Sequence, residues 1–116
     1  MNKLFLLITQ TLLIVATSTS AYAAVTYTST DKIKSIATYA LGNIGVAMVD
    51  SIITNPASCP NTDSYKLYKI TDTTDHGKNM YAMVLASKAS KNDIRLLIDN
   101  ATCTGGYAVI KGIISM

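Results

Sequence analysis

The stretch that decides the fold runs over residues 76–99 and reads HGKNMYAMVLASKASKNDIRLLID. Its first part places apolar side chains such as Met80 and Val84 at helical spacing, which predicts a helix with one buried stripe. Thr74 and Asp75 carry short oxygen-bearing side chains of the kind that cap the first turn. We therefore expect a helix that starts near Asp75.

The second part of this stretch changes from a helical to a strand-like period. Ser90, Lys91 and Asn92 are typical of a helix end, because asparagine tolerates left-handed backbone and lysine suits the negative end of the helix dipole. The apolar segment 94–98 is too short for another helix, and polar residues bound it on both sides. It predicts a half-buried strand.

Residues 1–23 have the form of a secretory signal peptide. Lys3 precedes an apolar run at 4–16, and the tripeptide Ala-Tyr-Ala at 21–23 is a small-residue cleavage site. The run is shorter than the roughly 20 residues that a membrane-spanning helix needs. We therefore expect a secreted or periplasmic protein without a membrane span, whose single domain is 24–116.

Cys59 and Cys103 are the two cysteines of the chain. An even number of cysteines in an exported protein predicts a disulfide, which a domain this small needs for stability unless partner subunits help. With one histidine in the sequence, a zinc site of four close ligands is disfavoured, and a catalytic thiol pair is more often C-x-x-C. We expect a Cys59–Cys103 disulfide, no metal and no cofactor.

Alternating and apolar segments separated by turn residues predict a series of short strands. The expected strands are 32–41, 44–53, 65–70, 94–98 and 107–114. Gly42-Asn43 suits a tight hairpin turn between the first two, and Gly112 marks a bulge or close approach in the last. Segment 25–30 fits either an edge strand or an N-terminal arm, and 54–64 is a loop.

The expected order is three strands, a helix and two strands. This is the element order of an OB-fold, a five-stranded Greek-key barrel that binds oligonucleotides or oligosaccharides. A ferredoxin-like order needs a helix between the first two strands, and the Gly42-Asn43 turn leaves no room for one. We therefore expect a mainly β protein with the OB-fold, one helix between strands 3 and 4, and one disulfide.

Residues that could perform catalysis are few and scattered. His76 stands at the expected helix start, where polar residues are common, and no nucleophile or orienting group accompanies it at a useful spacing. Asp93 and Asp99 lie at opposite ends of one predicted strand, too far apart to act as a glycosidase pair. We expect a protein that is not an enzyme; the competing hypothesis, a small hydrolase, would depend on His76.

Tyrosines and lysines interleave on the predicted third strand, at Tyr65, Lys66, Tyr68 and Lys69. Stacking aromatics between basic residues can bind single-stranded nucleic acid. The full sequence carries a net charge of only +3, and an exported protein meets little nucleic acid, so we expect no nucleic-acid partner. A tyrosine beside polar groups equally suits a sugar, because it has an apolar face and a hydrogen-bonding tip.

The signal peptide, domain size, strand order and segment MYAMVLASKASKNDIRLLID at 80–99 together resemble the B subunits of bacterial toxins that bind receptors as a pentamer. The likeness is above all to the subtilase-cytotoxin and pertussis-like branch. There a helix ends in a small polar turn and leads into a strand of apolar, arginine, apolar, apolar residues. The matching residues here are Ile94, Arg95, Leu96 and Leu97. The resemblance covers 32–116.

This resemblance implies a homopentamer whose helices line a central channel, a catalytic A chain as a further partner, and a shallow glycan pocket near the start of the first strand. The polar residues at that position are Thr30, Asp31, Lys32 and Ser35. Asp31 and Ser35 are the leading candidates for sugar contacts. The family also uses a tyrosine on the strand after the helix, where this chain has Leu97 and Ile98.

An alternative hypothesis is a monomeric periplasmic or secreted module that binds another protein, such as an inhibitor of an exported enzyme. One sheet face or the loop 54–64 would then engage the partner. The two hypotheses differ in oligomeric state and in ligand class, since the first requires a ring and a glycan.

Overall fold

The computed structural model describes residues 24–49, 53–61 and 67–116. The predicted signal peptide at 1–23 lies outside these residues, so its cleavage stays a prediction. The elements in chain order are β1 (Val25–Tyr27), β2 (Ile33–Thr38), the short 3-10 turn η3 (Ala40–Gly42), β3 (Ile44–Met48), β4 (Leu67–Ile70), α2 (Asp75–Ser90), β5 (Ile94–Thr104) and β6 (Tyr107–Ser115).

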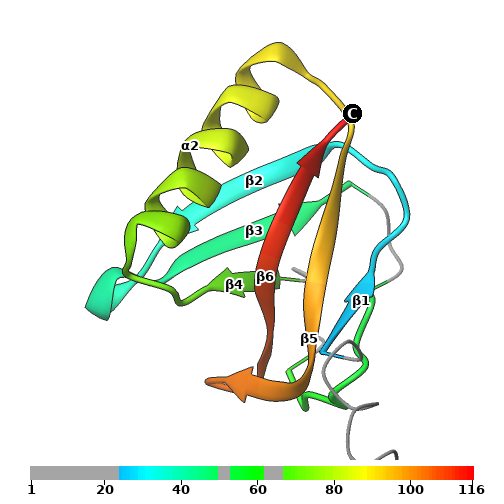
Figure 1. The fold of residues 1–116 in the computed structure, drawn as a ribbon, viewed down its shortest axis with the longest axis vertical. Coiled ribbons are helices and arrows are strands. Elements are labelled where there is room, and N and C mark those ends of the chain that lie inside the picture. The colour runs from blue at the N-terminus through cyan, green and yellow to red at the C-terminus, as the bar shows by residue number, and fades with distance from the viewer. Residues whose placement is uncertain (1–23, 50–52, 62–66) are drawn as a thin grey trace, which may run out of the picture.

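Six strands form one sheet in the order β1-β5-β6-β4-β3-β2 (Figure 1). All neighbouring strands run antiparallel except β4 and β6, which are parallel. Helix α2 contacts β2, β4 and β6. The mainly β class and the placement of a helix between β4 and β5 are thus confirmed. No helix in the described ranges combines the length and apolar character that crossing a membrane requires.

The sheet contains one strand more than expected and is not closed into a barrel. The additional strand is β1, which pairs with β5 and so resolves segment 25–30 as an edge strand. In the connection between β1 and β2, Asp31 exchanges backbone hydrogen bonds of 2.7 and 3.0 Å with Ile94 of β5. The pairing therefore shows an open six-stranded sheet with β1 and β2 as its edges, and the bridge ties the connection that leads into β2 to β5.

Helix α2 begins and ends at the expected residues. At its start, Asp72 accepts hydrogen bonds from the backbone N–H and the hydroxyl of Thr74, at 2.8 and 2.5 Å. At its end Lys91, and not Asn92, adopts the left-handed conformation, with φ of 57°. Its N–H then faces helix carbonyls that would otherwise lack a donor. The buried stripe is Gly77, Met80, Val84 and Ser87.

The connection between β2 and β3 is a wider turn than the two-residue hairpin predicted from Gly42-Asn43. Leu41 and Gly42 both have positive φ, 65° and 75°, and the N–H of Tyr39 donates to the carbonyl of Asn43 at 2.7 Å. Strand β2 therefore ends at Thr38, and Tyr39 leaves the strand before the turn. This placement decides where the Tyr39 ring lies.

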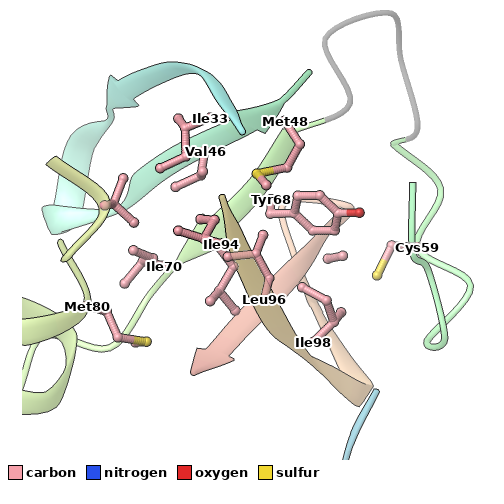
Figure 2. Close-up of a cluster of buried hydrophobic side chains, with 13 residues drawn as sticks. Ile33, Val46, Met48, Cys59, Tyr68, Ile70, Met80, Ile94, Leu96 and Ile98 are labelled. Atoms are coloured by element: carbon pink, nitrogen blue, oxygen red, sulfur yellow. The ribbon is translucent and has the colours of Figure 1, made fainter. Parts of the chain in front are cut away.

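The core lies on one face of the sheet, and α2 covers part of it (Figure 2). Met80 from the helix, Ile70 from β4, and Ile94 and Leu96 from β5 point into the same interior (Figure 2). Tyr68 is 2% exposed, and its hydroxyl accepts a hydrogen bond from the N–H of Thr54 at 2.7 Å. Tyr68 is therefore a core residue, while Tyr65 and Lys66 lie outside the described residues.

The predicted disulfide is confirmed. Cys59 and Cys103 are bonded with their Cα atoms 5.7 Å apart, which ties the loop after β3 to β5. Cys103 belongs to β5 and not to the following turn, which consists of Gly105 and Gly106 with φ of 57° and 82°. Closing a loop of this length stabilises the fold by about 4 kcal/mol in the chain-entropy model.

Gly112 marks a close approach, as expected. The pairing of β5 with β6 shifts by one residue beside it, because Leu97 opposes Gly112 while Ile98 opposes Ile110. A Cβ atom at Gly112 would lie 3.2 Å from the Cδ2 atom of Leu97.

Candidate functional site

The connection between β1 and β2 is fastened along the start of β5. Thr28 is buried; its N–H donates to the carbonyl of Leu96 and its hydroxyl accepts from the N–H of Leu96, both at 2.9 Å. Three residues further along, the Asp31–Ile94 bridge fixes the same connection. Segment 28–32 is therefore held rigidly against β5 at the corner of the sheet.

The structure brings three of the four predicted glycan contacts together and separates the fourth. Thr30, Asp31 and Lys32 share the connection, whereas Ser35 lines a cavity further along β2. One Asp31 carboxylate oxygen accepts from the N–H of Lys32 at 2.7 Å. The Lys32 ammonium pairs with Asp93 at 2.5 Å, both side chains being about half-exposed. The charge of Lys32 is thus already compensated.

An aromatic ring and a cation lie on the outer face of this corner. Tyr27 is 55% exposed and opposes Leu97 in the β1–β5 register. Arg95 lies two residues before Leu97 and so on the same face, and its guanidinium carbon is 5.9 Å from the centroid of the Tyr27 ring. We call Tyr27, Thr30, Asp31, Lys32 and Arg95 the corner site.

Within the described residues, Arg95 has no ion-pair partner, and its Nε atom has no hydrogen-bond partner. The ion pairs of that part of the chain join Lys32 to Asp93 and Lys111 to Asp99, and none involves Arg95. Its Nε atom is buried and has no hydrogen-bond partner. An unpaired buried donor costs about 1–3 kcal/mol. Because the Nε–H is out of reach of a ligand, an external acceptor would have to bond to the terminal nitrogens of the guanidinium. Carboxylate oxygens are the acceptors that arginine binds best.

The second surface is a cavity of about 250 Å³ on the outer face of the sheet. Its lining residues are Ser35, Ala37, Tyr39, Ala47, Leu67 and Tyr107. The ammonium of Lys69 lies 4.9 Å from the ring centroid of Tyr39 and 4.7 Å from that of Tyr107. We call this group, Lys69 included, the tyrosine–lysine cavity.

The residues weighed for catalysis serve structural contacts. Nε2 of His76 donates to the carbonyl of Lys111 at 2.9 Å and so ties the helix start to β6. The pKa of Asp99 lies below its usual value, chiefly because the N–H of Ala101 donates to its carboxylate. The pKa of Asp72 is lowered in the same way by the hydroxyl and the N–H of Thr74. No three metal-ligating side chains gather within the ranges that the structure describes.

Sequence reasoning missed the aromatic residues of both surfaces. The sequence pattern fits both a strand and an arm for the segment that contains Tyr27, and it marks Arg95 only through the likeness to a family. Tyr39 and Tyr107 stand at strand ends, where side-chain direction depends on turn geometry. No model of a known protein family matches the chain, and a search of curated proteins finds no match.

Proposed function

We propose that the protein is a secreted, non-enzymatic binding subunit that recognises host-surface glycans through the corner site. The observation that carries this proposal is the Arg95 guanidinium, which lies over the exposed Tyr27 ring and forms no ion pair within the described residues. An aromatic face beside an uncompensated cation favours a sugar that bears an acidic group.

Each part of the corner site has a function in this proposal. The Tyr27 ring offers its face to the apolar C–H side of a pyranose, as aromatic side chains do in carbohydrate sites. Arg95 donates to a carboxylate of the sugar, and Thr30, which is exposed, contributes a hydroxyl for a ring hydroxyl in this proposal. Asp31 and Lys32 hold the connection in shape, because their polar groups already bond within the chain.

We further propose that the sheet is an open form of the OB-type architecture, to which β1 adds a sixth strand. The parallel β4–β6 pair and the Asp31–Ile94 bridge, which ties the connection leading into β2 to β5, support this assignment. The edges β1 and β2 leave backbone groups without a strand partner in the described sheet. Pairing of neighbouring copies would cover such edges and would give the homopentamer, resembling a toxin B subunit with a catalytic A chain.

The test of glycan recognition is an array of acidic and uncharged host glycans probed with the purified secreted protein. We expect acidic glycans to be retained and Arg95→Gln to weaken their binding at least tenfold. Lys78→Gln is the matched control, because it removes one positive charge in the first turn of α2, at the end of the helix away from the start of β5 (Figure 1). Unchanged binding by Arg95→Gln, or retention of uncharged glycans alone, contradicts the proposal.

The oligomeric state separates this proposal from the alternative of a protein-binding module. Light scattering at micromolar concentration is expected to give five subunits. A strict monomer that retains a protein and no glycan would replace the proposal with the alternative.

A further inference from the structure

The tyrosine–lysine cavity exists because small residues face each other on neighbouring strands. In the β2–β3 register Ser35 opposes Ala47 and Ala37 opposes Gly45, so the outer face lacks large side chains there. Ala47 and Leu67 oppose each other across β3 and β4 and are only 3% and 6% exposed. The result is a hollow with an apolar floor.

Gly45 allows the Tyr39 ring to form one wall of this hollow. A Cβ atom at Gly45 would lie 2.8 Å from the Cε2 atom of Tyr39 and 3.0 Å from both Cδ atoms of Leu67. The ring of Tyr39 therefore packs directly over the backbone of β3. Tyr107, at the start of β6, forms part of the lining as well.

Lys69 lies between the two tyrosine rings and differs from Arg95 in its surroundings. Two ring faces at 4.9 and 4.7 Å attract its ammonium through their quadrupoles. A Cβ atom on Gly105 would approach that ammonium to 3.3 Å, so the turn after β5 also adjoins it. The cation is partly compensated by the protein itself, while its N–H groups can still donate to a neutral oxygen.

We propose that the tyrosine–lysine cavity is a second carbohydrate site that holds one uncharged pyranose unit. The apolar floor and a tyrosine face match the C–H side of the sugar, and the hydroxyl of Ser35 and the ammonium of Lys69 match its hydroxyls. The volume of about 250 Å³ lies below the roughly 300–1,000 Å³ of sites for drug-sized ligands, which suits a single sugar unit. A purely apolar ligand would leave the Ser35 hydroxyl without a partner.

This site is separate from the corner site. None of the corner residues lines the cavity, and the two surfaces use different strands, β1 and β5 against β2, β3, β4 and β6. The proposal of a second site can therefore be tested independently of the proposed recognition of acidic glycans.

The test is a titration of the isotope-labelled protein with uncharged methyl hexopyranosides of the gluco, galacto, manno and N-acetylglucosamine series, followed by amide chemical shifts. We expect at least one of them to shift the amides of Ser35, Ala37 and Ala47 at millimolar concentration. Ala37→Leu, which fills the hollow from the edge strand, should weaken that binding at least tenfold. Tyr39→Ala should do the same by removing a wall, and a dispersed spectrum shows that each variant folds.

Arg95→Gln is the control, since it should leave the cavity shifts unchanged while it weakens binding of acidic glycans. Absence of cavity shifts with all four sugars overturns the proposal. So does binding that survives both Ala37→Leu and Tyr39→Ala in folded protein. Tighter binding of methyl glucuronide than of methyl glucoside in the cavity would overturn the assignment to uncharged sugars.

Discussion

The corner site and the tyrosine–lysine cavity each place a basic side chain beside tyrosine, but the surroundings of the positive charge differ. At the corner, Arg95 lies 5.9 Å from one tyrosine ring and has a buried N–H without an acceptor. In the cavity, Lys69 lies between Tyr39 and Tyr107, within 5 Å of both ring centroids. We therefore expect a basic side chain beside tyrosine to bind an anion only where the protein does not already compensate the charge of that side chain.

The two surfaces are also built by different means. The corner is held by backbone hydrogen bonds between segments far apart in the sequence, at Thr28–Leu96 and Asp31–Ile94. The cavity results from small side chains at Ala37, Gly45 and Ala47, which leave space that the neighbouring rings enclose. Changes that loosen the backbone should therefore affect the corner, and changes in side-chain volume should affect the cavity.

The largest effect is expected from removal of the disulfide, which stabilises the whole domain. The double variant Cys59→Ala, Cys103→Ala should lower the free energy of unfolding by about 4 kcal/mol, because the unfolded chain regains the entropy that the closed loop removes. Urea unfolding of the two proteins measures this difference. At urea concentrations where both are folded, the ligand affinities of corner and cavity should be unchanged. A selective loss at one surface would show that the loop 53–61 belongs to that site.

The next effect should be confined to the corner. Thr28→Val keeps the shape of the side chain but removes the oxygen that accepts from the N–H of Leu96. The buried N–H then lacks this partner, which costs about 1–3 kcal/mol in stability. Hydrogen exchange should accelerate at Leu96 and Asp31 and stay unchanged at Ala37 and Ala47.

Thr26→Val is the matched control for this substitution. The Thr26 hydroxyl bonds to the side chain of Asn100 at 2.5 Å, outside the connection that shapes the corner. It should therefore leave exchange at Leu96 unchanged. Equal acceleration in both variants, or acceleration at the cavity amides, would contradict the view that the two surfaces are built independently.

Sequence reasoning predicted the elements whose signals are local. The helix at 75–90 follows from apolar spacing and from the helix-stop residues at its end, although Thr74 makes no side-chain capping bond at its start. The disulfide follows from two cysteines in a chain with a predicted export signal. Gly112 marked a close approach because a missing side chain is itself a local signal. At the end of the helix, the residue with left-handed backbone is Lys91 and not Asn92. Local sequence signals do not distinguish these adjacent positions.

The sites were predictable only in part, because they depend on register and turn geometry. A shift of one residue sends a side chain to the other face of a sheet, and this decides that Tyr68 is core while Lys69 reaches the cavity. The wide turn with Leu41 at positive φ was unforeseen, since leucine rarely adopts that conformation. It places Tyr39 beside Ser35, a juxtaposition that no sequence spacing reveals.

A smaller effect should be confined to the cavity. Lys69→Met retains the length and apolar stem of the side chain but removes the ammonium between the rings. Loss of the cation–π contacts should lower stability by about 0.5–1 kcal/mol and weaken binding of the uncharged sugar, because one donor is lost. The affinity of the corner for acidic glycans should stay the same. A loss of acidic-glycan binding in Lys69→Met would instead place the acidic group in the cavity.

The smallest effect is a loss of stability at low pH. It should be larger at the corner than at the cavity, because Asp99 pairs with β1, the strand that carries Tyr27. Asp99 pairs with Val25 in the β1–β5 register, and its side chain is 13% exposed. Its pKa in the folded state lies below the usual 3.8, chiefly through the N–H of Ala101. A lowered folded-state pKa means that the unfolded chain takes up the proton first as pH falls, so the stabilisation is complete above about pH 4 and is lost below it.

We therefore expect hydrogen exchange at Val25 and Thr26 to accelerate between pH 4 and pH 2.5, after correction for intrinsic rates, more than exchange at Ala37 and Ala47. Asp99→Asn keeps an oxygen that can accept from Ala101 but cannot titrate, so most of this acid dependence at β1 should disappear. Asp72 also has a lowered pKa but lies at the helix start, so Asp72→Asn should leave the acid response of β1 in place. If exchange at Val25 and Thr26 still accelerates in acid in Asp99→Asn, other titrating groups hold β1. The acid response would then not be explained by Asp99 and would not distinguish the corner from the cavity.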